Sequence, residues 1–537
     1  MTASSMSDQS NASTRVMDET LDQPRPRPTS HISLLFDHSR IDDAVLNYTY
    51  PGKGTQEHPY VVSWIPEDAG NPYNWSKGAK WTITMISALT CFAVAFSSSA
   101  YTGTMMELMM YFRSSSTLIT AGVSLYVLGF ALGPLIWAPL SEIYGRQLIF
   151  AISYGLYAVF SAACTADDGV ATLLILRFFA GTFGSSPLTN AGGVVSDVFR
   201  PDERSIAMGV FSLAPSMGPT LGPFIGGYLG QYEGWRWVMG LMGILAGVCW
   251  ILGLILVPET YAPLILKKRA QALSAKTGRV YISEYEQQGK VESPTVILKK
   301  ALSRPLQLLF VEPIVLILSI YTAIVYGTLY MLFGAYPVVF QLERGWSPGE
   351  GGLAFLGIAV GMILALPVVS VMNLRYMKVA QRSADGVAPP EARLAGSMLG
   401  GILVPAGMFW FAWTSFTSIH WMVPISSGVF FGLGMTLIFH SIFNYLIDAY
   451  TIYAASVLAA NAVLRSLFGA AFPLFTRQMY EDLGTQWAST VPAFLALACL
   501  PMPFVLYKYG PAIRRKCKYS AKAAKAAESA TPAAEQA

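Results

Sequence analysis

The sequence is poor in charged residues, and this scarcity excludes most classes of soluble protein. Asp, Glu, Lys and Arg make up 13% of its 537 residues, whereas a soluble chain carries about 25%. Apolar residues reach 53%, and the mean hydropathy is +0.45. Runs of about 20 apolar residues recur, each long enough to cross a bilayer as a helix. We find twelve of them, at 81–103, 118–138, 147–165, 170–192, 205–229, 237–257, 313–335, 351–371, 395–413, 421–441, 452–475 and 489–507.

Sequence motifs for catalysis and nucleotide binding are also missing. There is no Gly-x-x-x-x-Gly-Lys-Ser/Thr phosphate loop, no Gly-x-Ser-x-Gly nucleophile elbow and no Ser-His-Asp set. Only His420 and His440 lie near the apolar runs, too few for a histidine-rich di-metal membrane enzyme. We therefore expect no enzyme, no metal site and no cofactor. Without an ATP site, uphill transport has to use an ion gradient.

Cysteine is scarce too, with five residues and no Cys-x-x-Cys pair. Cys91, Cys164, Cys249 and Cys499 fall in or at the ends of different apolar runs. We interpret them as small apolar packing residues, because such scattered positions suit neither a disulfide framework nor a metal site.

The few basic residues are concentrated in three segments, at 267–304, 375–393 and 508–525. The loops predicted on the opposite side carry single arginines, such as Arg113 and Arg236. Because Lys and Arg favour the cytosolic side of a membrane protein, we expect both termini and the long middle segment in the cytosol. The net charge of +4 is then a topology signal, and nucleic acid is not an expected partner.

The distribution of apolar runs divides the chain into five parts. Residues 1–79 are polar and predict a mostly disordered cytosolic tail without a cleaved signal peptide. Six runs form an N-terminal half at 80–258, and six form a C-terminal half at 308–508. A cytosolic linker at 259–307 joins the halves, and a basic cytosolic tail follows at 509–537. Two sets of six runs suggest a duplication.

The fifth run contains glycines and prolines that each recur every four residues. Positions four apart share a helix face, so the glycines predict a groove that another helix backbone approaches closely. Three prolines would break a water-soluble helix, but a membrane helix tolerates them. The residues are Pro215, Gly218, Pro219, Gly222, Pro223 and Gly226.

The loop between the second and third runs combines an acid, a glycine and an arginine: Glu142, Gly145 and Arg146. An acid beside a helix start, together with Arg146, can hold neighbouring helix ends by charge-assisted hydrogen bonds. The alternative is an ordinary cytosolic turn with a topogenic arginine.

The fourth run contains Arg177, with Gly181 on the same helix face. Arg177 lies roughly 10 Å inside the outer end, by the helical rise. A charge in the hydrocarbon region is costly and normally faces a cavity or a partner. The alternative is a side chain that extends outward to the interface.

Two further sets are candidates for a substrate cavity. In the eleventh run, Asn461 precedes Arg465 by one turn, a pair that suits an anionic or hydrogen-bonding group, either of a substrate or of a structural partner. In the seventh run, Tyr326, Tyr330 and Phe333 form one helix face. Aromatic faces with hydroxyl tips suit amphipathic or cationic organic molecules, although helix packing alone also explains them.

These motifs resemble those of the major facilitator superfamily. The fifth run looks like its exporter signature, the 142–146 loop like its Gly-x-Asp-Arg-x-Gly-Arg loop, and Arg177 like an arginine implicated in proton coupling. Glu142 replaces the usual Asp, and Ile143 stands where the family often has Arg. Together with Asn71-Pro72-Tyr73-Asn74-Trp75, Asp197-Val198-Phe199-Arg200 and Pro258-Glu259-Thr260, the pattern resembles the fungal twelve-span drug:proton antiporters, in the branch with polyamine and azole exporters.

The resemblance implies an all-α membrane protein of two six-helix halves that works as a monomer. It implies proton-coupled efflux of small hydrophobic or amphipathic organic compounds, such as drugs, toxins and secondary metabolites, across the plasma membrane or, as the alternative, the vacuolar membrane. The partners expected are a small-molecule substrate, protons and the lipid bilayer.

Three alternatives remain open at this point: a polyamine exporter, a proton-driven nutrient importer and a non-transporting membrane sensor. A long structured cytosolic domain would favour the sensor, and the sequence predicts none. No acid is placed at mid-depth, so Glu107 and Asp448, both near the ends of runs, are weak candidates for the proton carrier.

Overall fold

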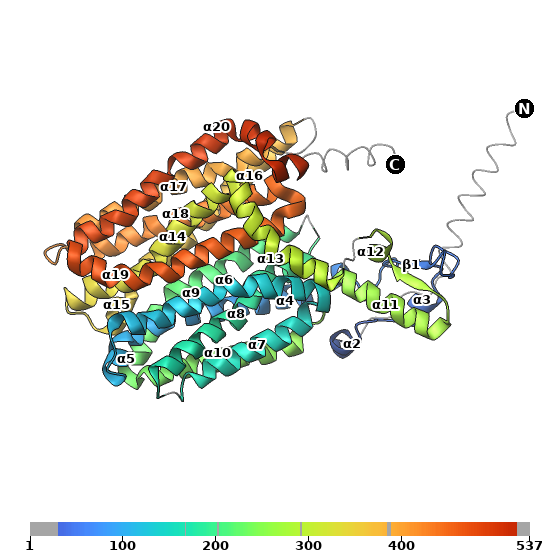
Figure 1. Ribbon diagram of the computed structural model, residues 1–537, viewed down its shortest axis with the longest axis horizontal. Coiled ribbons are helices and arrows are strands. Elements are labelled where there is room, and N and C mark those ends of the chain that lie inside the picture. The colour runs from blue at the N-terminus through green and yellow to red at the C-terminus, as the bar shows by residue number, and fades with distance from the viewer. Residues whose placement is uncertain (1–30, 167, 201–202, 290–292, 384–387, 524–537) are drawn as a thin grey trace, which may run out of the picture.

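A computed structural model describes residues 31–166, 168–200, 203–289, 293–383 and 388–523. Two groups of long helices lie side by side, and a small group of short elements projects beyond one end (Figure 1). The first group holds α4 (Lys77–Ala100), α5 (Met105–Tyr111), α6 (Ser116–Tyr144), α7 (Arg146–Ala163), α8 (Val170–Val198), α9 (Arg204–Glu233) and α10 (Trp235–Leu256).

The second group contains the later helices, shown in yellow to red in Figure 1. They are α13 (Pro294–Val311), α14 (Pro313–Tyr336), α15 (Pro348–Leu353), α16 (Leu356–Arg382), α17 (Ala395–Thr414), α18 (Met422–Tyr450), α19 (Ala454–Cys499) and α20 (Pro501–Lys516). A kink at Gly484, whose φ is 74°, divides α19 into two segments.

Every predicted apolar run lies mostly within these helices. Eight helical stretches of the described chain are long and apolar enough to cross a membrane, and the last of them, Met422–Lys516, spans three predicted runs. Helices α7 and α9 are not among the eight, and α9 carries three prolines and several glycines. The all-helical architecture therefore agrees with the sequence, while the number of crossings stays a prediction.

The packing of the two groups repeats. In the first group α4 packs on α9 and α6 on α8, and in the second α14 packs on α19 and α16 on α18. These are the first–fifth and second–fourth pairs of each set of six. Between the groups, α6 contacts α19, and α9 contacts α15 and α16. The same pairings in both sets are what a duplicated six-helix unit gives.

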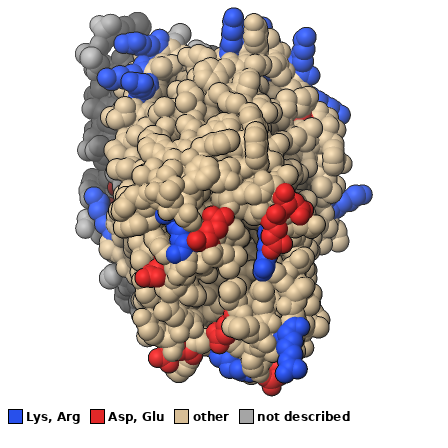
Figure 2. Space-filling view, turned by 90° about the vertical axis from the view of Figure 1, so that its left-hand side faces the viewer, with Lys and Arg blue, Asp and Glu red and all other residues tan. Residues whose placement is uncertain are grey.

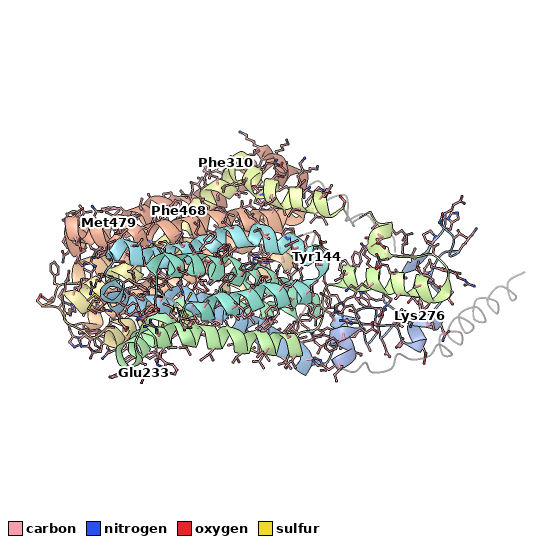
Figure 3. The ribbon with its side chains drawn as sticks, turned by 60° about the horizontal axis from the view of Figure 1, so that its bottom comes forward. Tyr144, Glu233, Lys276, Phe310, Phe468 and Met479 are labelled. Carbon is pink, nitrogen blue, oxygen red and sulfur yellow. The ribbon has the colours of Figure 1, made fainter. Side chains whose placement is uncertain are left out.

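The two ends of the helical bundle differ. Tyr144, at the end of α6, lies at the end that carries the short elements, whereas Glu233 and Met479 lie at the opposite, far end (Figure 3). Viewed from the far end, acidic and basic side chains lie next to one another on a largely uncharged surface (Figure 2). Two ion pairs of the loops and helix ends are of this kind, Arg236–Asp168 and Arg477–Glu481.

The short elements come from both the N-terminal tail and the linker. They are α2 (His31–Phe36), α3 (Asp43–Asn47), β1 (Tyr60–Val62), α11 (Ala262–Thr277), β2 (Tyr281–Ser283) and α12 (Glu284–Gln287). Strand β1 pairs in parallel with β2, with Tyr60 opposite Tyr281. We call residues 31–74 and 262–287 the tail–linker module.

The module has an apolar core of its own. Val45 and Val62 of the tail are buried against α11, where Leu266 and Leu273 are fully buried. The prediction of a mostly disordered tail over 1–79 is therefore wrong from His31 onward, and residues 1–30 lie outside the described residues. The apolar residues of the tail are too few to form a core alone, and they complete one only with the linker helix.

A buried ion pair joins the two parts of the module. Arg269 of α11 donates from Nη1 to Oδ2 of Asp68 at 2.5 Å, and the two side chains are 0% and 3% exposed. Arg269 also donates to the carbonyl oxygens of Ser39 and Arg40. Arg40 in turn donates from Nη2 to the carbonyl oxygen of Glu259 at 2.6 Å, so the tail contacts the end of the helical bundle.

We expect Asp68→Ala to unfold the tail–linker module locally, because Arg269 would be left as a buried charge without its carboxylate. Removing one partner of a buried pair costs about 3–5 kcal/mol, enough to raise the population of the open module about 100-fold or more. Limited chymotrypsin digestion of the full chain in detergent measures this opening.

The matched control is Lys267→Met, which removes the half-exposed pair of Lys267 with Glu286, 4.0 Å apart. An exposed pair contributes about 1 kcal/mol or less. Equal cleavage rates for the two variants would contradict a stabilising role of the buried pair.

Candidate functional site

Arg177 of α8 is buried among the first-group helices, with 2% of its surface exposed. Its donors meet backbone oxygens of two other helices: Nη1 to Ser97 at 2.9 Å, Nε to Gly122 at 3.2 Å and Nη2 to Ser98 at 3.5 Å. The guanidinium carbon lies 4.6 Å and 4.5 Å from the ring centres of Tyr101 and Tyr126. Arg177 therefore does not extend to the interface, and carbonyl dipoles and aromatic faces compensate its charge.

Gly181 brings α6 close enough for these contacts. A Cβ atom on Gly181 would lie 2.0 Å from the carbonyl oxygen of Tyr126. A side chain at this position would separate α8 from α6, and Arg177 would then lose its reach to Gly122. The spacing predicts that Arg177 and Gly181 share one face of α8. In the structure this face packs against α6.

A chain of hydroxyl groups connects the surroundings of Arg177 to the second group of helices. The Ser98 hydroxyl lies 2.9 Å from the Tyr330 hydroxyl, and the Tyr326 hydroxyl donates to Tyr330 at 3.3 Å. Tyr330 is fully buried and its ring meets Phe333 edge to face, 5.0 Å between centres. Tyr330 thus lies where the two halves meet.

Phe333 lies nearer the far end, where it lines a cavity between the halves. Met105, Met109, Gln341 and Arg477 also line this cavity. The residues of the predicted aromatic face of the seventh run therefore lie in two different places. Tyr330 is buried where the halves meet, and Phe333 lines the cavity.

Arg465 of α19 is the second arginine inside the bundle. Its guanidinium carbon lies 4.8 Å, 5.8 Å and 5.7 Å from the ring centres of Tyr326, Phe439 and Phe443. Its Nε atom is buried without a hydrogen-bond partner. Phe468, three residues further along α19, lies about midway along the bundle (Figure 3), so Arg465 is also placed at mid-depth.

Asn461 does not act together with Arg465. Its amide nitrogen donates to the hydroxyls of Thr322 at 2.7 Å and Ser319 at 3.3 Å, both on α14. Asn461 is a structural partner of α14, whereas no described residue accepts a hydrogen bond from Arg465. The structural alternative therefore holds for Asn461, and a substrate contact of Arg465 stays a prediction.

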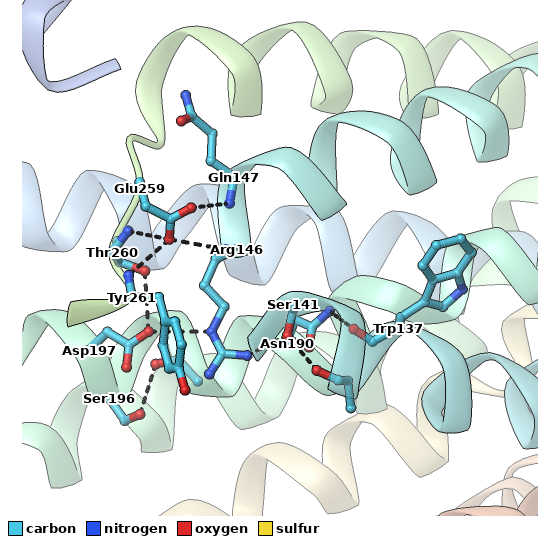
Figure 4. A network of polar contacts seen from close by, with 12 residues as sticks. Trp137, Ser141, Arg146, Gln147, Asn190, Ser196, Asp197, Glu259, Thr260 and Tyr261 are labelled. Atoms are coloured by element: carbon cyan, nitrogen blue, oxygen red, sulfur yellow. Dashed lines mark hydrogen bonds and ion pairs between the residues drawn. The ribbon is translucent and has the colours of Figure 1, made fainter. Parts of the chain in front are cut away.

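A polar network holds the module-facing ends of α6, α7 and α8 together (Figure 4). Arg146 donates from Nη1 to the Ser141 hydroxyl at 2.6 Å and from Nε to Asp197 at 3.5 Å. Glu259 accepts the backbone N–H groups of Arg146 and Gln147, at 3.0 Å and 3.2 Å. A carboxylate at the first N–H groups of α7 is well placed for the helix dipole. We call Arg146, Asp197 and Glu259 the helix-end clamp.

The acid predicted for this clamp is wrong. Glu142 is exposed, and no ion pair within 4 Å joins it to Arg146 among the described residues. Gly145 explains the difference: its φ of 97° ends α6 and turns the chain so that Arg146 meets Asp197 and Glu259 instead. A Cβ atom on Gly145 would lie 2.2 Å from Glu259, so the clamp needs a glycine here.

Asp197 and Glu259 were not predicted as clamp residues. Each is an acid at the end of a helical segment, near other residues of the family motifs, but the two come from segments far apart in the chain. Spacing along one helix cannot show that they meet at Arg146.

The glycines of the fifth run lie directly against α4, as the spacing predicts. A Cβ atom on Gly218 would lie 2.6 Å from the backbone nitrogen of Phe96, and one on Gly226 2.2 Å from the carbonyl oxygen of Ala100. On the other side, the Pro223 carbonyl oxygen approaches Gly352 of α15. Helix α9 is therefore packed between its own half and the other half, and a role of this stripe in antiport stays a prediction.

The two weak candidates for the proton carrier lie away from the central arginines. Asp448 accepts from Arg393 Nε at 2.9 Å and from the Tyr376 hydroxyl at 3.0 Å. Glu107 lies near Gly234, at the far end of α9. Among the described residues, no carboxylate lies within 4 Å of Arg177 or Arg465, so neither candidate forms an ion pair with a central arginine in this conformation.

Comparison with known proteins places this architecture among transporters. The sequence profile described as Major Facilitator Superfamily matches residues 87–473. The chain is 56% identical to "MFS-type efflux pump MFS2" of Trichophyton rubrum, over 93% of this chain and 84% of that protein. It is 54% identical to "Major facilitator superfamily multidrug transporter mdrA" of Aspergillus fumigatus, over 94% and 83% of the two chains.

A solved structure supports the fold. The inward-open xylose transporter XylE from E. coli is similar with a TM-score of 0.58, over 79% of this chain and 96% of that chain. The sequence identity is 15%, so this similarity concerns the arrangement of helices and not the substrate.

Proposed function

The chain belongs to the major facilitator superfamily, and we propose that it exports small hydrophobic or amphipathic organic compounds by alternating access, in exchange for protons. It is a multi-pass membrane transporter and not an enzyme. Two relatives with more than half of their residues identical carry the names efflux pump and multidrug transporter, which supports export of drugs or toxins. The plasma membrane is the proposed location, and a monomer the proposed working unit.

The observation that carries this proposal is a pair of arginines, one in each half, that hydroxyl groups connect across the contact of the halves. Arg177 is linked through Ser98 to Tyr330 and Tyr326, and Tyr326 covers Arg465. A ligand beside Tyr326 or Arg465 thus lies at the place where the halves move relative to each other. In transporters of two repeats, the substrate binds near the bilayer midplane between them.

The central charges disfavour polyamine export. A polyamine carries several positive charges, which require carboxylates as partners. Among the described residues the centre offers two arginines and aromatic rings, with no carboxylate within 4 Å of either arginine. An aromatic or otherwise apolar organic substrate fits this surface better.

Alternating access requires contacts at the far end that can open. There, Gly227 of α9 approaches the carbonyl oxygen of Pro348, and the Gln231 side chain accepts the backbone N–H of Gly349 at 3.2 Å. Helix α9 links this contact to α4 through its glycines. We propose that α9 moves with the first half when the far end opens.

The proton gradient is the proposed energy source, and inside-out membrane vesicles test it. We expect vesicles with an acidic lumen to accumulate 1-naphthamide, a neutral aromatic probe, in the absence of ATP. A protonophore should stop accumulation, and vesicles without the protein should show none. Accumulation that persists after the gradient has collapsed would contradict proton coupling.

A further inference from the structure

We infer that Arg465 is an anion-binding residue and that the exported compounds include aromatic carboxylates or phenolates. This inference rests on the proposed function and specifies its substrate class. It starts from the hydrogen-bonding capacity of Arg465. A guanidinium group has five N–H donors and stays charged at any physiological pH. No hydrogen bond joins these donors to a described residue, and Nε is buried without a partner.

Burial of an unpaired donor is costly. An unsatisfied buried donor costs about 1–3 kcal/mol, and more when it is charged. Arg177, the buried arginine of the first half, meets this demand with three backbone oxygens. Arg465 is partly buried and has no such acceptors among the described residues, so its donors are available to an acceptor from outside the protein.

The aromatic rings around Arg465 leave these donors free. Tyr326, Phe439 and Phe443 lie within 6 Å of the guanidinium carbon, a distance at which a ring face attracts a cation. A ring face stabilises the charge but accepts little of the directed N–H hydrogen bonding. A carboxylate can accept two parallel N–H groups from one guanidinium.

The same rings provide a surface for the apolar part of the ligand. Phe439 and Phe443 stack on each other along α18, 5.7 Å between centres and 15° apart, and Tyr326 lies 6.4 Å from Phe439. Aromatic rings favour offset or edge-to-face contacts with other aromatic groups. A flat aromatic body with one anionic group therefore matches both parts of the site.

The position of the site connects binding to movement. Tyr326 belongs to α14 and donates to Tyr330, which contacts Ser98 of the first half. An anion on Arg465 would draw the guanidinium toward the ligand and change its contact with Tyr326. Binding of an anion at Arg465 can therefore change the contact between the halves.

A matched pair of probes tests the inference: 1-naphthoate, ionised at pH 7 like other carboxylic acids, and 1-naphthamide, which has the same ring system and no charge. Equilibrium binding to the purified full chain and accumulation in inside-out vesicles are measured for both. We expect Arg465→Gln to weaken 1-naphthoate binding about 10- to 100-fold, the value of one charged hydrogen-bonding pair. Binding of 1-naphthamide should change little, and Arg465→Lys should recover part of the 1-naphthoate binding because it keeps the charge.

The control variant is Arg236→Gln, which changes an exposed arginine at the far end of the first half whose partner is Asp168. It should leave binding of both probes unchanged. Equal losses of both probes in Arg465→Gln would mean that Arg465 only supports the fold, and unchanged 1-naphthoate binding would also overturn the inference. If the unchanged protein accumulates 1-naphthamide but does not bind 1-naphthoate, the substrate class is wrong and the proposed efflux stands. If it binds 1-naphthoate through Arg465 but accumulates neither probe, the site stands and the proposed efflux is wrong.

Discussion

Gly222→Leu is expected to slow transport about 100-fold while the protein still reaches the membrane. A Cβ atom at this position would lie 2.0 Å from the Ser99 hydroxyl and 2.7 Å from the backbone nitrogen of Ala100. The backbone of α4 cannot move away locally, so the leucine separates α4 from α9. Overpacking of this kind costs about 1–3 kcal/mol. If the leucine strains only one conformation of the transport cycle, and the strain is about 3 kcal/mol, transport slows about 100-fold.

Gly209→Leu, on the same helix, is the matched control, because a Cβ atom on Gly209 meets no atom within 4 Å. The measurement is 1-naphthamide accumulation in vesicles, divided by the amount of protein in the membrane. A full rate in Gly222→Leu would mean that α4 and α9 are not in contact during the limiting step. A loss in both variants would point to a general intolerance of α9 toward leucine.

Arg177→Ala should reduce gradient-driven efflux at least about 100-fold, because each lost hydrogen bond to a buried charged group contributes about 1.5–3 kcal/mol. The substitution leaves the carbonyl oxygens of Ser97 and Gly122 without their donor and opens a void between two tyrosine rings. Arg177→Lys keeps the charge but cannot reach α4 and α6 at the same time, so we expect partial recovery. Substrate binding should remain measurable, since the rings at Arg177 are those of Tyr101 and Tyr126 and not the rings around Arg465.

The control for this experiment is Arg236→Ala. Arg236 also lies over two aromatic rings, those of Tyr111 and Trp235, but it is exposed at the far end. Its loss should change efflux little. If Arg177→Ala exports at the rate of the unchanged protein, the buried contacts of Arg177 with α4 and α6 do not matter for the transport cycle.

The sequence predicted the features that depend on local pattern. Long apolar runs are helical because a bilayer or a protein interior requires internal backbone hydrogen bonding, and the four-residue spacing of Gly218, Gly222 and Gly226 placed them on one face. The inward orientation of Arg177 was also predicted, because a charge in the hydrocarbon region normally faces a cavity or a partner. Its compensation by carbonyl oxygens and tyrosine rings was not, since those groups belong to other helices.

Features that depend on contacts between distant segments were missed. The helix-end clamp takes Arg146, Asp197 and Glu259 from three segments, and the nearby Glu142 was the wrong choice because Gly145 reverses the chain between it and Arg146. Asn461 and Arg465 were paired because four residues separate them. Four residues turn a helix by about 400°, which leaves the two side chains about 40° apart. This offset is enough for Asn461 to bind α14 while Arg465 faces the aromatic rings.

The tail–linker module joins the two ends of the chain segment that contains the first six long helices. Because β1 precedes α4 and β2 follows α10 in the sequence, their pairing joins the beginning of this half to its end. During synthesis, β1 has no partner until the chain has been made as far as β2, so the module can form only after all the helices between them have been made. A single break within a loop of this half would leave two fragments that the module still holds together. The two ends of the first half are thus held together by noncovalent contacts, and these contacts use no residue of the second half.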